Sequence, residues 1–398
     1  MTHSKLTLNI IANCAQGPLL SGGDRIFIEL SRRLAKTGVT VNVYVWEEGL
    51  AMCRRNHLTG VNIVIWKLGP LAKLGMPLTY ILRIVNGLIQ AARIKPQNGQ
   101  SVVYSASDFW PDSLPAFVMH RKLASSKWIA GFYLFAPSPF RGFRQNKNVR
   151  LPSLRETIYY LTQIPIFWLI KSYAAKICVT SAPDTKPFLK AGRRKEDLLA
   201  VSGGVNLEPV KKYLKNPRRE SFIYDACFMG RFHPQKGVVE LIKIWSLVCR
   251  QKPSAKLALI GEGPLKSKII SEIKRYRLSD NVKLLGYLGD GEQKYRVFRQ
   301  SRIILHPALY DSGGMSAWEG MVWGRPGIGY DLPALKTYYP QGMLKVEKAN
   351  QAKFAQAIIA LLDNPRLQRT LAQKAQQWAF DEWDWDKKAV KFLSFINS

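Results

Sequence analysis

The chain has 398 residues, a length that favours two α/β domains of nearly 200 residues each over a single core. With 47% hydrophobic and 11% aromatic residues, the composition is that of a folded globular protein and excludes intrinsic disorder. The five cysteines are scattered and include no C-x-x-C pair, so the sequence predicts neither a disulfide framework nor a cysteine metal site and favours a reducing cytosol.

The net charge of +31 is extreme and unevenly distributed. Residues 49–183 carry a net charge of +14, from seventeen Lys and Arg and only three acids, Asp108, Asp112 and Glu156. Such a field attracts a polyanion, which could be nucleic acid or the anionic surface of a membrane. Charge alone does not discriminate between these two partners.

Neither of two apolar segments has the length of a membrane signal. Residues 6–12 are too short for a signal peptide and lead directly into a domain strand. Residues 159–170 are interrupted by Gln163 and Pro165 and are too short to span a bilayer. We therefore expect no signal peptide and no transmembrane helix.

The first half of the chain alternates strands with helices. Strands are expected at residues 6–12, 39–45, 60–66, 101–104, 128–134, 175–180 and 198–201, and helices at 24–38 and near 77–92, 111–123, 154–174 and 184–190. This alternation predicts a mostly parallel sheet. A glycine loop containing Gly22 and Gly23 follows the first strand, at the edge where open α/β sheets place ligands.

Two segments of the first half combine an apolar stripe with basic flanks, as interfacial membrane-binding elements do. In residues 71–95 the stripe is Leu74, Leu78, Ile81, Leu82, Val85, Leu88 and Ile89, beside Lys73, Arg83, Arg93 and Lys95. In residues 140–155, Arg141, Arg144, Lys147, Arg150 and Arg155 surround Phe140, Phe143, Val149 and Leu151. The alternative for each is an element that faces the core and has a solvated basic side, and the sequence leaves both interpretations open.

A polar, proline-containing segment, residues 206–219, predicts a hinge between a first domain (residues 1–205) and a second (residues 206–380). The alternation then restarts. Strands are expected at residues 223–229, 256–260, 282–285, 303–305 and 327–329, and helices near 238–249, 265–276, 292–301, 351–362 and 367–380, with a short helix from Met315. A last amphipathic segment, residues 383–396, closes the chain.

Residues 310–330 form the most distinctive motif of the second half. Asp311 opens a turn, Gly313 and Gly314 follow, and Glu319 lies on the short helix that comes next. A glycine loop that leads into a helix leaves backbone N–H groups free to meet an anion. A carboxylate one turn into the helix could accept hydrogen bonds from sugar hydroxyls, so the motif suits a nucleotide sugar. The alternative is a plain strand–turn–helix connection with a surface acid.

Two shorter motifs also follow predicted strands. In residues 230–237, Arg231 and Lys236 bracket a turn, and two cations beside a helix start favour a diphosphate. The alternative is a pair of surface basic residues on a basic protein. In residues 260–264, glycines would let a base or ribose approach the backbone, although a plain tight turn fits equally well.

Together these motifs, in this order and spacing, resemble the donor half of the family 4 glycosyltransferases. Gly22-Gly23 with the following helix, and residues 201–206, are similar to the family's first glycine loop and to its approach to the hinge. The resemblance covers most of the chain. It implies an α/β fold of two Rossmann-like domains facing each other across a cleft (GT-B), with the active site in that cleft. It also implies retaining, metal-independent sugar transfer from a nucleotide diphosphate without a cofactor, and a final helix (residues 381–398) that crosses back to the first domain.

The resemblance also implies roles for individual residues. Arg231 and Lys236 would hold the diphosphate, Asp311 would contact the donor sugar, and Glu319 would bind the ribose. The remaining substrate-binding residues would be Gly22, Gly23, Gly230, Gly261, Glu262, Gly263, Ser312, Gly313, Gly314 and Met315.

Two departures from the family pattern concern the chemistry. Asp311 stands where the family usually has Glu, and one methylene less moves the carboxylate by roughly 1.5 Å, which can matter in a pre-organised site. Many members carry a histidine at the end of the strand expected at residues 128–134, where this chain has Phe132, Tyr133 and Phe135. We therefore name no general base. A front-face mechanism, in which the leaving phosphate assists the acceptor hydroxyl, needs none.

Other classes of protein explain less of the sequence. Asp384 and Asp386 form an Asp-x-Asp pair, as in metal-dependent transferases, but no sheet follows them. A phosphate-loop ATPase is excluded because the chain has no G-x-x-x-x-G-K-[ST]. A basic nucleic-acid-binding protein would account for the charge but not for glycines and acids at successive strand ends. A catalytically silent, glycosyltransferase-like scaffold is the third alternative.

The interpretation that we carry forward is a peripheral membrane glycosyltransferase on the cytoplasmic face of the cell membrane. It would move a hexose-type sugar to a lipid-linked or cell-surface glycan acceptor, in polysaccharide or lipopolysaccharide biosynthesis. Its expected partners are a nucleotide sugar, the glycan acceptor and an anionic membrane surface, and no nucleic acid.

Overall fold

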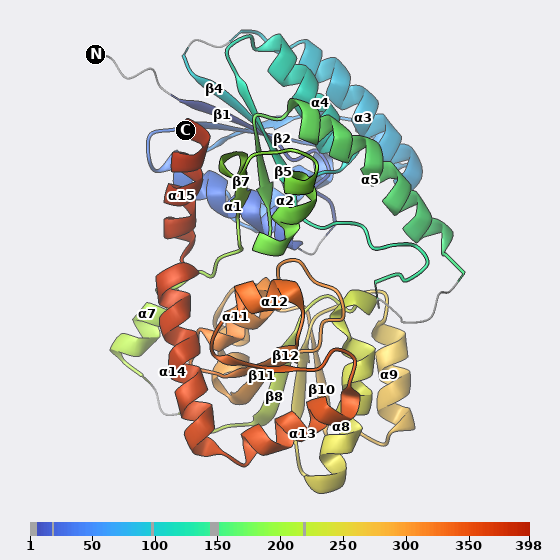
Figure 1. Ribbon diagram of the computed structural model, residues 1–398, viewed down its shortest axis with the longest axis vertical. Helices are drawn as coiled ribbons and strands as arrows, with labels where there is room; N and C mark the ends of the chain where they lie inside the picture. Colours follow the sequence, from blue (N-terminus) through green and yellow to red (C-terminus); the bar gives the residue numbers. More distant parts are fainter. Residues whose placement is uncertain (1–5, 18–19, 97–98, 144–150, 218–219) are drawn as a thin grey trace. The chain divides into compact units, whose positions relative to one another are not determined.

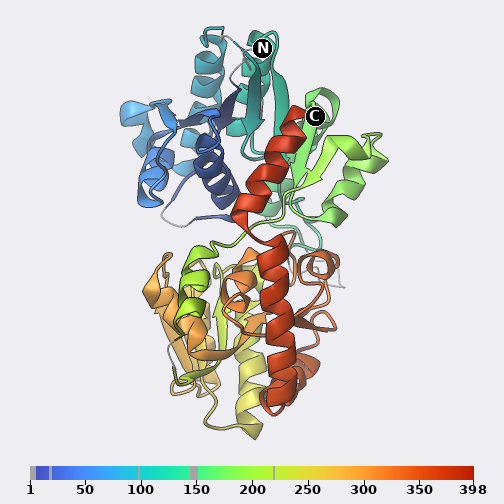
Figure 2. The ribbon, with the colours of Figure 1, turned by 90° about the vertical axis from the view of Figure 1, so that its left-hand side faces the viewer.

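The computed structural model describes residues 6–17, 20–96, 99–143, 151–217 and 220–398, and it contains two compact units (Figures 1 and 2). Unit 1 comprises Met1–Ala136, Ser153–Gly203 and Trp385–Ser398, and unit 2 comprises Pro137–Pro152 and Gly204–Asp384. Residues 137–143, 151 and 152, which the sequence interpretation kept in the first domain, thus group with unit 2. The predicted basic residues at 144, 147 and 150, and Val149, lie outside the described residues.

Unit 1 is built on a seven-stranded parallel sheet in the order β3-β2-β1-β4-β5-β6-β7. The strands are β1 (Thr7–Ile11), β2 (Thr40–Val45), β3 (Asn62–Ile65), β4 (Ser101–Ser105), β5 (Lys127–Phe132), β6 (Lys176–Val179) and β7 (Leu198–Ala200). The central strands are short apolar runs buried on both faces, as parallel strands covered by helices require. The predicted parallel sheet is confirmed.

Helices connect these strands. They are α1 (Gly22–Ala35), α2 (Glu47–Arg55), α3 (Met76–Ala92), α4 (Trp110–Lys122), α5 (Leu154–Tyr173), α6 (Lys186–Lys190) and α15 (Trp385–Asn397), with 3-10 turns at Gly69–Lys73, Ala182–Thr185 and Lys195–Asp197. Within the described residues, no helix has both the length and the apolar character needed to cross a bilayer.

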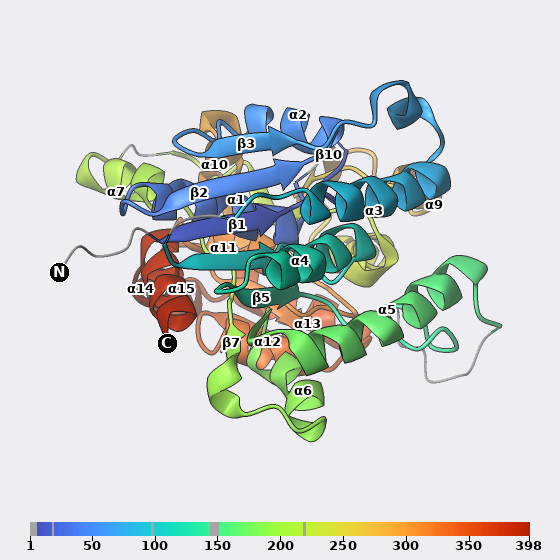
Figure 3. The ribbon, with the colours of Figure 1, turned by 90° about the horizontal axis from the view of Figure 1, so that it is seen from above.

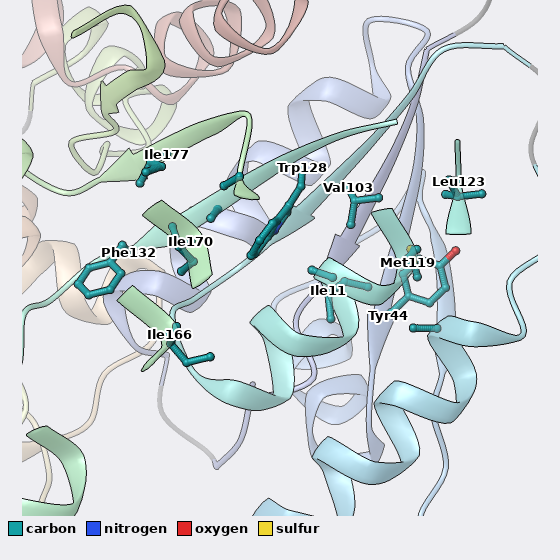
Figure 4. Packing of buried hydrophobic residues seen from close by; sticks show 14 of the residues in the cluster. Ile11, Tyr44, Val103, Met119, Leu123, Trp128, Phe132, Ile166, Ile170 and Ile177 are labelled. Atoms are coloured by element: carbon teal, nitrogen blue, oxygen red, sulfur yellow. The ribbon is translucent and has the colours of Figure 1, made fainter. Parts of the chain in front are cut away.

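One hydrophobic core of unit 1 lies between the sheet and helices α4 and α5 (Figure 4). Trp128 on β5 is fully buried in it, and its indole N–H donates a hydrogen bond to the Ser105 hydroxyl (3.2 Å). Ile166 and Ile170 of α5 pack into the same cluster. The core therefore holds α5 against strands β5 and β6.

The last helix, α15, completes unit 1 from the far end of the chain (Figure 2). It packs against α1 and buries Trp385, Phe392 and Ile396. The Lys176 ammonium on β6 donates to the Phe395 carbonyl (2.7 Å), so the helix is also held by polar contacts.

Unit 2 has a six-stranded parallel sheet in the order β10-β9-β8-β11-β12-β13. Its strands are β8 (Tyr224–Met229), β9 (Leu257–Ile260), β10 (Val282–Gly286), β11 (Ser301–His306), β12 (Gly327–Tyr330) and β13 (Met343–Val346). Its helices are α7 (Glu208–Lys215), α8 (Val238–Gln251), α9 (Lys266–Arg275), α10 (Glu292–Arg299), α11 (Met315–Met321), α12 (Pro333–Tyr338), α13 (Gln351–Leu362) and α14 (Pro365–Glu382), with a 3-10 turn at Pro234–Lys236.

The structure adds elements that the sequence interpretation did not contain. Helix α7 occupies much of the predicted hinge, α2 follows β2, and α12 and β13 extend the end of the second sheet. The division between the units falls between Gly203 and Gly204 and again between Asp384 and Trp385. The fold class, two Rossmann-like α/β domains, agrees with the prediction.

Candidate functional site

Strand order brings the two main motifs of unit 2 together. Strands β8 and β11 are parallel neighbours, so their carboxyl ends lie at the same edge of the sheet. Gly237, which follows the turn after β8, has the left-handed φ of +63°, and a Cβ there would lie 2.0 Å from the Pro307 carbonyl oxygen. The Leu309 N–H also donates to the Gln235 carbonyl (2.8 Å). Glycine thus permits the close packing of the two loops that carry Lys236 and Asp311.

Lys236, Asp311 and His306 form one buried cluster at this edge. The Lys236 ammonium lies 2.6 Å from Asp311 Oδ2, although the two residues are 75 positions apart. His306 Nε2 lies 3.1 Å from the same oxygen. Asp311 Oδ1 accepts from the Gly313 N–H (3.1 Å), so both oxygens of the carboxylate are engaged.

The electrostatics of this cluster fix its charges at neutral pH. Burial alone would raise the pKa of Asp311, but the Lys236 ammonium and the His306 hydrogen bond hold it well below its usual range. Burial lowers the pKa of His306 despite the adjacent carboxylate. The imidazole is therefore neutral, and the hydrogen bond requires the tautomer with its proton on Nε2. The result is an ionised carboxylate with one cation and one neutral donor.

The glycine loop wraps directly over His306. A Cβ at Gly314 would lie 2.7 Å from His306 Nε2 and 3.3 Å from the Tyr339 hydroxyl, so a side chain there would displace the ring. The buried Tyr339 hydroxyl has no hydrogen-bond partner among the described residues. Ser312 is buried in the same loop, and Met315 begins α11.

Glu319 makes its contacts with a residue that the sequence interpretation did not consider. Its carboxylate pairs with the ammonium of Lys294 on α10, which also binds Asp290. Lys294 is almost fully buried, so it depends on these carboxylates for compensation of its charge. The predicted ribose-binding carboxylate is therefore part of a preformed ion-pair network.

Arg231 is exposed, unlike the residues of the buried cluster. Its side chain makes no hydrogen bond or ion pair within the described part of the chain. Of the two predicted diphosphate cations, the structure therefore joins only Lys236 to the glycine loop.

The motif after β9 owes its glycines to chain packing. A Cβ at Gly261 would lie 2.0 Å from the Gly230 carbonyl oxygen, and one at Gly263 would lie 2.7 Å from the Phe232 carbonyl oxygen. Glu262 pairs with Lys266 one helical turn later (2.7 Å). Glycine at these positions therefore permits the close approach of the ends of β8 and β9. The sequence interpretation left a ligand contact and a plain tight turn open here, and the ligand contact stays a prediction.

The predicted glycines of the first half belong to unit 1. Gly22 and Gly23 form the first turn of α1, whose N-cap Ser21 accepts from the Asp24 N–H (3.2 Å). A Cβ at Gly23 would meet the Tyr133 ring at 3.2 Å. Tyr133, at the position where a family histidine was sought, pairs its hydroxyl with that of Tyr104.

The Asp-x-Asp pair does not form a common site. Asp386 pairs with Arg33 of α1 (2.6 Å), whereas Asp384 pairs with Lys211 of α7 (3.7 Å). Among the described residues, no group of three or more His, Cys, Asp or Glu side chains is placed to hold a metal ion.

Sequence reasoning missed His306, Lys294 and Tyr339. His306 had a detectable signal, because it is the last residue of an apolar strand immediately before the glycine loop. Lys294 had no such signal, because its partner Glu319 lies 25 residues away on another helix. Tyr339 had none either, because only the folded chain brings its ring against His306.

A protein-family model matches most of unit 2. Residues 214–378, about two fifths of the chain, match the model of the family described as glycosyl transferases group 1. The resemblance seen in the sequence is thereby confirmed at the level of this family, whereas the narrower assignment to family 4 stays a prediction.

The curated relatives are less than 30% identical to this chain and match only part of it. The chain is 28% identical over 160 residues to a poly(glycerol-phosphate) alpha-glucosyltransferase of Bacillus subtilis, covering 39% of this chain and 23% of that protein. It is 24% identical over 210 residues to a poly(ribitol-phosphate) alpha-N-acetylglucosaminyltransferase of Staphylococcus aureus, covering 51% and 40%. The chain thus spans less than half the length of these two relatives.

Solved structures share the fold over the whole chain. A sucrose-phosphate synthase from Thermosynechococcus elongatus has a TM-score of 0.73 at 17% identity, covering 99% of this chain and 98% of that one. HepE from Anabaena, solved with UDP and glucose, has a TM-score of 0.68 at 14% identity, covering 99% and 100%. A TarM mutant from S. aureus, solved with UDP, has a TM-score of 0.70 at 11% identity, covering 98% and 100%. At these identities the likeness shows the GT-B fold.

Proposed function

We propose that this chain, whose residues 214–378 form a glycosyl transferases group 1 domain, is a retaining, metal-independent glycosyltransferase of the family 4 kind. It moves a hexose-type sugar from a nucleotide diphosphate to a lipid-linked or cell-surface glycan. It works without a cofactor, as a peripheral protein on the cytoplasmic face of the cell membrane, in polysaccharide or lipopolysaccharide biosynthesis. Nucleic acid is not a partner in this proposal.

The observation that carries the proposal is the buried contact of Lys236 with Asp311 beside the glycine loop. An ammonium held at the carboxyl ends of parallel strands is suited to the charge that builds up on a departing nucleoside diphosphate. The ionised Asp311 carboxylate can accept hydrogen bonds from sugar hydroxyls. Neutral His306 keeps that carboxylate oriented and adds no charge.

The chemical step needs no protein base. The bond between the anomeric carbon and the phosphate oxygen breaks, and the acceptor oxygen bonds to the same face of that carbon. The acceptor proton passes to an oxygen of the leaving phosphate, so charge and atoms balance. Exposed Arg231 joins Lys236 in neutralising the diphosphate when the donor binds.

The relatives support the choice of substrates. Two of them are named for transfer of glucose or N-acetylglucosamine to glycerol- or ribitol-phosphate polymers, and HepE was solved with UDP. We therefore place UDP-glucose and UDP-N-acetylglucosamine first among the donors to be tested. The basic character of residues 49–183 supports an anionic or membrane-borne acceptor.

Donor-dependent thermal protection tests the proposal. A nucleotide sugar from a panel with different bases and sugars is expected to raise the melting temperature and to be hydrolysed slowly in the absence of acceptor. Lys236→Ala is expected to lower kcat by about 100-fold or more, since one charge-stabilising group is removed from the transition state. Lys252→Ala is the matched control, because Lys252 also pairs with an aspartate (Asp363, 2.5 Å) but follows the last residue of α8, whereas Lys236 precedes the first.

The competing interpretations give different results. A silent scaffold would be protected by a donor without turnover, and a nucleic-acid-binding protein would be protected by single-stranded DNA. Protection by no member of the panel, or equal loss of activity in Lys252→Ala, would contradict the proposed function.

A further inference from the structure

Helix α3 buries polar and small residues and exposes large apolar ones. The buried positions of α3 are Thr79, Arg83, Gly87 and Ala91. Arg83 is almost fully buried, donates to Gln16 Oε1 (3.0 Å) and lies 4.4 Å over the Trp46 ring. The pattern is the reverse of an ordinary surface helix, whose apolar stripe faces the core.

Close packing explains why the small face points inward. A Cβ at Gly87 would lie 2.7 Å from the Pro115 side chain of α4, so α3 can approach α4 only through its small residues. The larger apolar residues of α3 are consequently left outside. Leu78, Ile81, Val85 and Ile89 repeat at helical spacing, and each is between 45% and 56% exposed.

Helix α5 also carries large apolar residues on its exposed side, although it buries isoleucines as well. It buries Gln163, whose amide donates to Asp108 (2.7 Å), together with Ile166 and Ile170. Its outer positions include Leu161 and Trp168, which are more than half exposed. Lys171 lies 5.2 Å over the Trp168 ring. Tryptophan is enriched where membrane proteins meet the bilayer interface.

The two helices flank α4 in unit 1 (Figure 3). Helix α4 packs against both. Trp110, at the start of α4, links the other two helices: its backbone N–H donates to the Tyr80 hydroxyl of α3, and its indole N–H donates to the Thr162 carbonyl of α5. We group the exposed apolar residues of the two helices, Leu78, Ile81, Val85, Ile89, Leu161 and Trp168, as the α3–α5 apolar face. An exposed apolar surface of this kind marks an interaction site.

Basic residues outnumber acidic ones around this face. Basic Lys73, Arg93 and Lys95 are exposed at the two ends of α3. Of the three acids in residues 49–183, Asp108 and Asp112 are buried, and Glu156 is hydrogen-bonded to Ser153 in the first turn of α5. The acids that could offset the basic residues are therefore inside the protein or engaged at a helix start.

We propose that the α3–α5 apolar face inserts into the headgroup–acyl boundary of an anionic lipid bilayer. Aliphatic and tryptophan side chains enter the boundary, and the flanking Lys and Arg contact lipid phosphates. The inference deepens the membrane part of the proposed function by naming the surface and its partner, and it does not depend on the sugar chemistry.

Charge and side-chain type favour lipid over two other occupants. A second copy of the chain would bring two strongly basic surfaces together, which costs electrostatic energy. Nucleic acid would match the charge but not the aliphatic residues, because leucine, isoleucine and valine neither stack on bases nor bind phosphates.

Vesicle flotation of the full chain, without nucleotide sugar, tests the inference. Wild-type protein is expected to float with vesicles containing about one third phosphatidylglycerol and not with pure phosphatidylcholine. Ile81→Glu with Val85→Glu, and separately Leu161→Glu, should weaken binding at least about tenfold, since a carboxylate must then enter the boundary. Val390→Glu is the matched control, because Val390 is exposed on α15 of the same unit and lies outside the face.

Insertion is separated from electrostatic adsorption by a second measurement. Brominated lipids are expected to quench tryptophan fluorescence in wild-type protein and to quench it less in Trp168→Phe. Quenching should persist in about 1 M salt, where surface electrostatics are screened.

Several results would overturn the inference. These are absence of flotation with anionic vesicles, unchanged flotation of the glutamate variants, an equal loss in Val390→Glu, and a dimer of the wild-type chain that the same variants dissociate. Thermal protection by nucleotide sugar, measured without lipid, should be the same in all variants. Lost protection with intact flotation would contradict the proposed function alone.

Discussion

Asp311 is the residue at which the contacts of the candidate site meet. Its carboxylate pairs with the Lys236 ammonium and accepts hydrogen bonds from His306 and from the Gly313 N–H, and its side chain is almost completely buried. The family's usual glutamate would have to fit one more methylene into this space, so the shorter acid and its close lysine belong together. The departure that the sequence raised as a doubt thus has a local structural counterpart.

The buried His306–Asp311 pair makes stability depend on pH in a definite direction. Burial holds the pKa of His306 below its ordinary value. Below about pH 6.5 this histidine is therefore protonated in the unfolded chain while it stays neutral in the folded one. Stability is therefore lost as the pH falls through this range. The pKa of Asp311 is also held low, so its contribution is present above about pH 4 and is lost at lower pH.

We expect His306→Gln to reduce the loss of melting temperature between about pH 7 and pH 5, since glutamine can still donate to Asp311 but does not titrate. Calorimetry at several pH values measures the difference from wild type. His57→Asn is the control, because His57 is exposed and asparagine tolerates its φ of 50°. An unchanged slope in His306→Gln would mean that the imidazole is not kept neutral by burial.

At the scale of single elements, the packing of loops decides where the site residues lie. The turn after β8 reaches Asp311 only because Gly237 accepts both a left-handed conformation and the Pro307 carbonyl. Loss of that glycine should therefore disturb stability and donor binding together.

We expect Gly237→Ala to lower the free energy of unfolding by at least about 3 kcal/mol and to weaken nucleotide-sugar binding, since strain and a backbone clash act together. Gly192→Ala is the matched control, because Gly192 has a φ of +89° with no atom within 4 Å of the added Cβ. It should cost only about 1 kcal/mol. Equal effects at the two positions would show that the close approach of Gly237 to Pro307 does not contribute to the loss of free energy of unfolding.

Helix α3 shows where sequence patterns stop being informative. Its periodicity correctly predicted an amphipathic helix, but the sequence left open whether the apolar stripe faced the core. Gly87 decides the matter through its contact with Pro115 of α4, a residue 28 positions away in a separate helix. Periodicity defines a face, whereas only tertiary packing determines what that face meets.

At the scale of the whole molecule, strand–helix alternation was sufficient to predict two parallel α/β units. The family resemblance implied that Lys236 and Asp311 would both bind the donor, and the structure pairs the two side chains. The pairing of Glu319 with Lys294 could not be predicted, since the sequence does not indicate which of many basic residues is buried. For the same reason Arg231 and Lys236 seemed equivalent, although only Lys236 is held by an acid.

The two units have separate cores, yet unit 1 takes its last helix from the far end of the chain. Removal of residues 385–398 takes away buried Trp385, Phe392 and Ile396 and the acceptor of Lys176. We expect the loss to destabilise unit 1 by more than about 5 kcal/mol, because three large apolar side chains leave its core. In calorimetry the melting temperature of the unit 1 transition should fall. The unit 2 transition, which a nucleotide sugar raises because the donor loops belong to unit 2, should keep its temperature. Val390→Ala, an exposed change on the same helix, should leave both transitions in place. A parallel fall of both transitions after the truncation would show that the units unfold as one cooperative body.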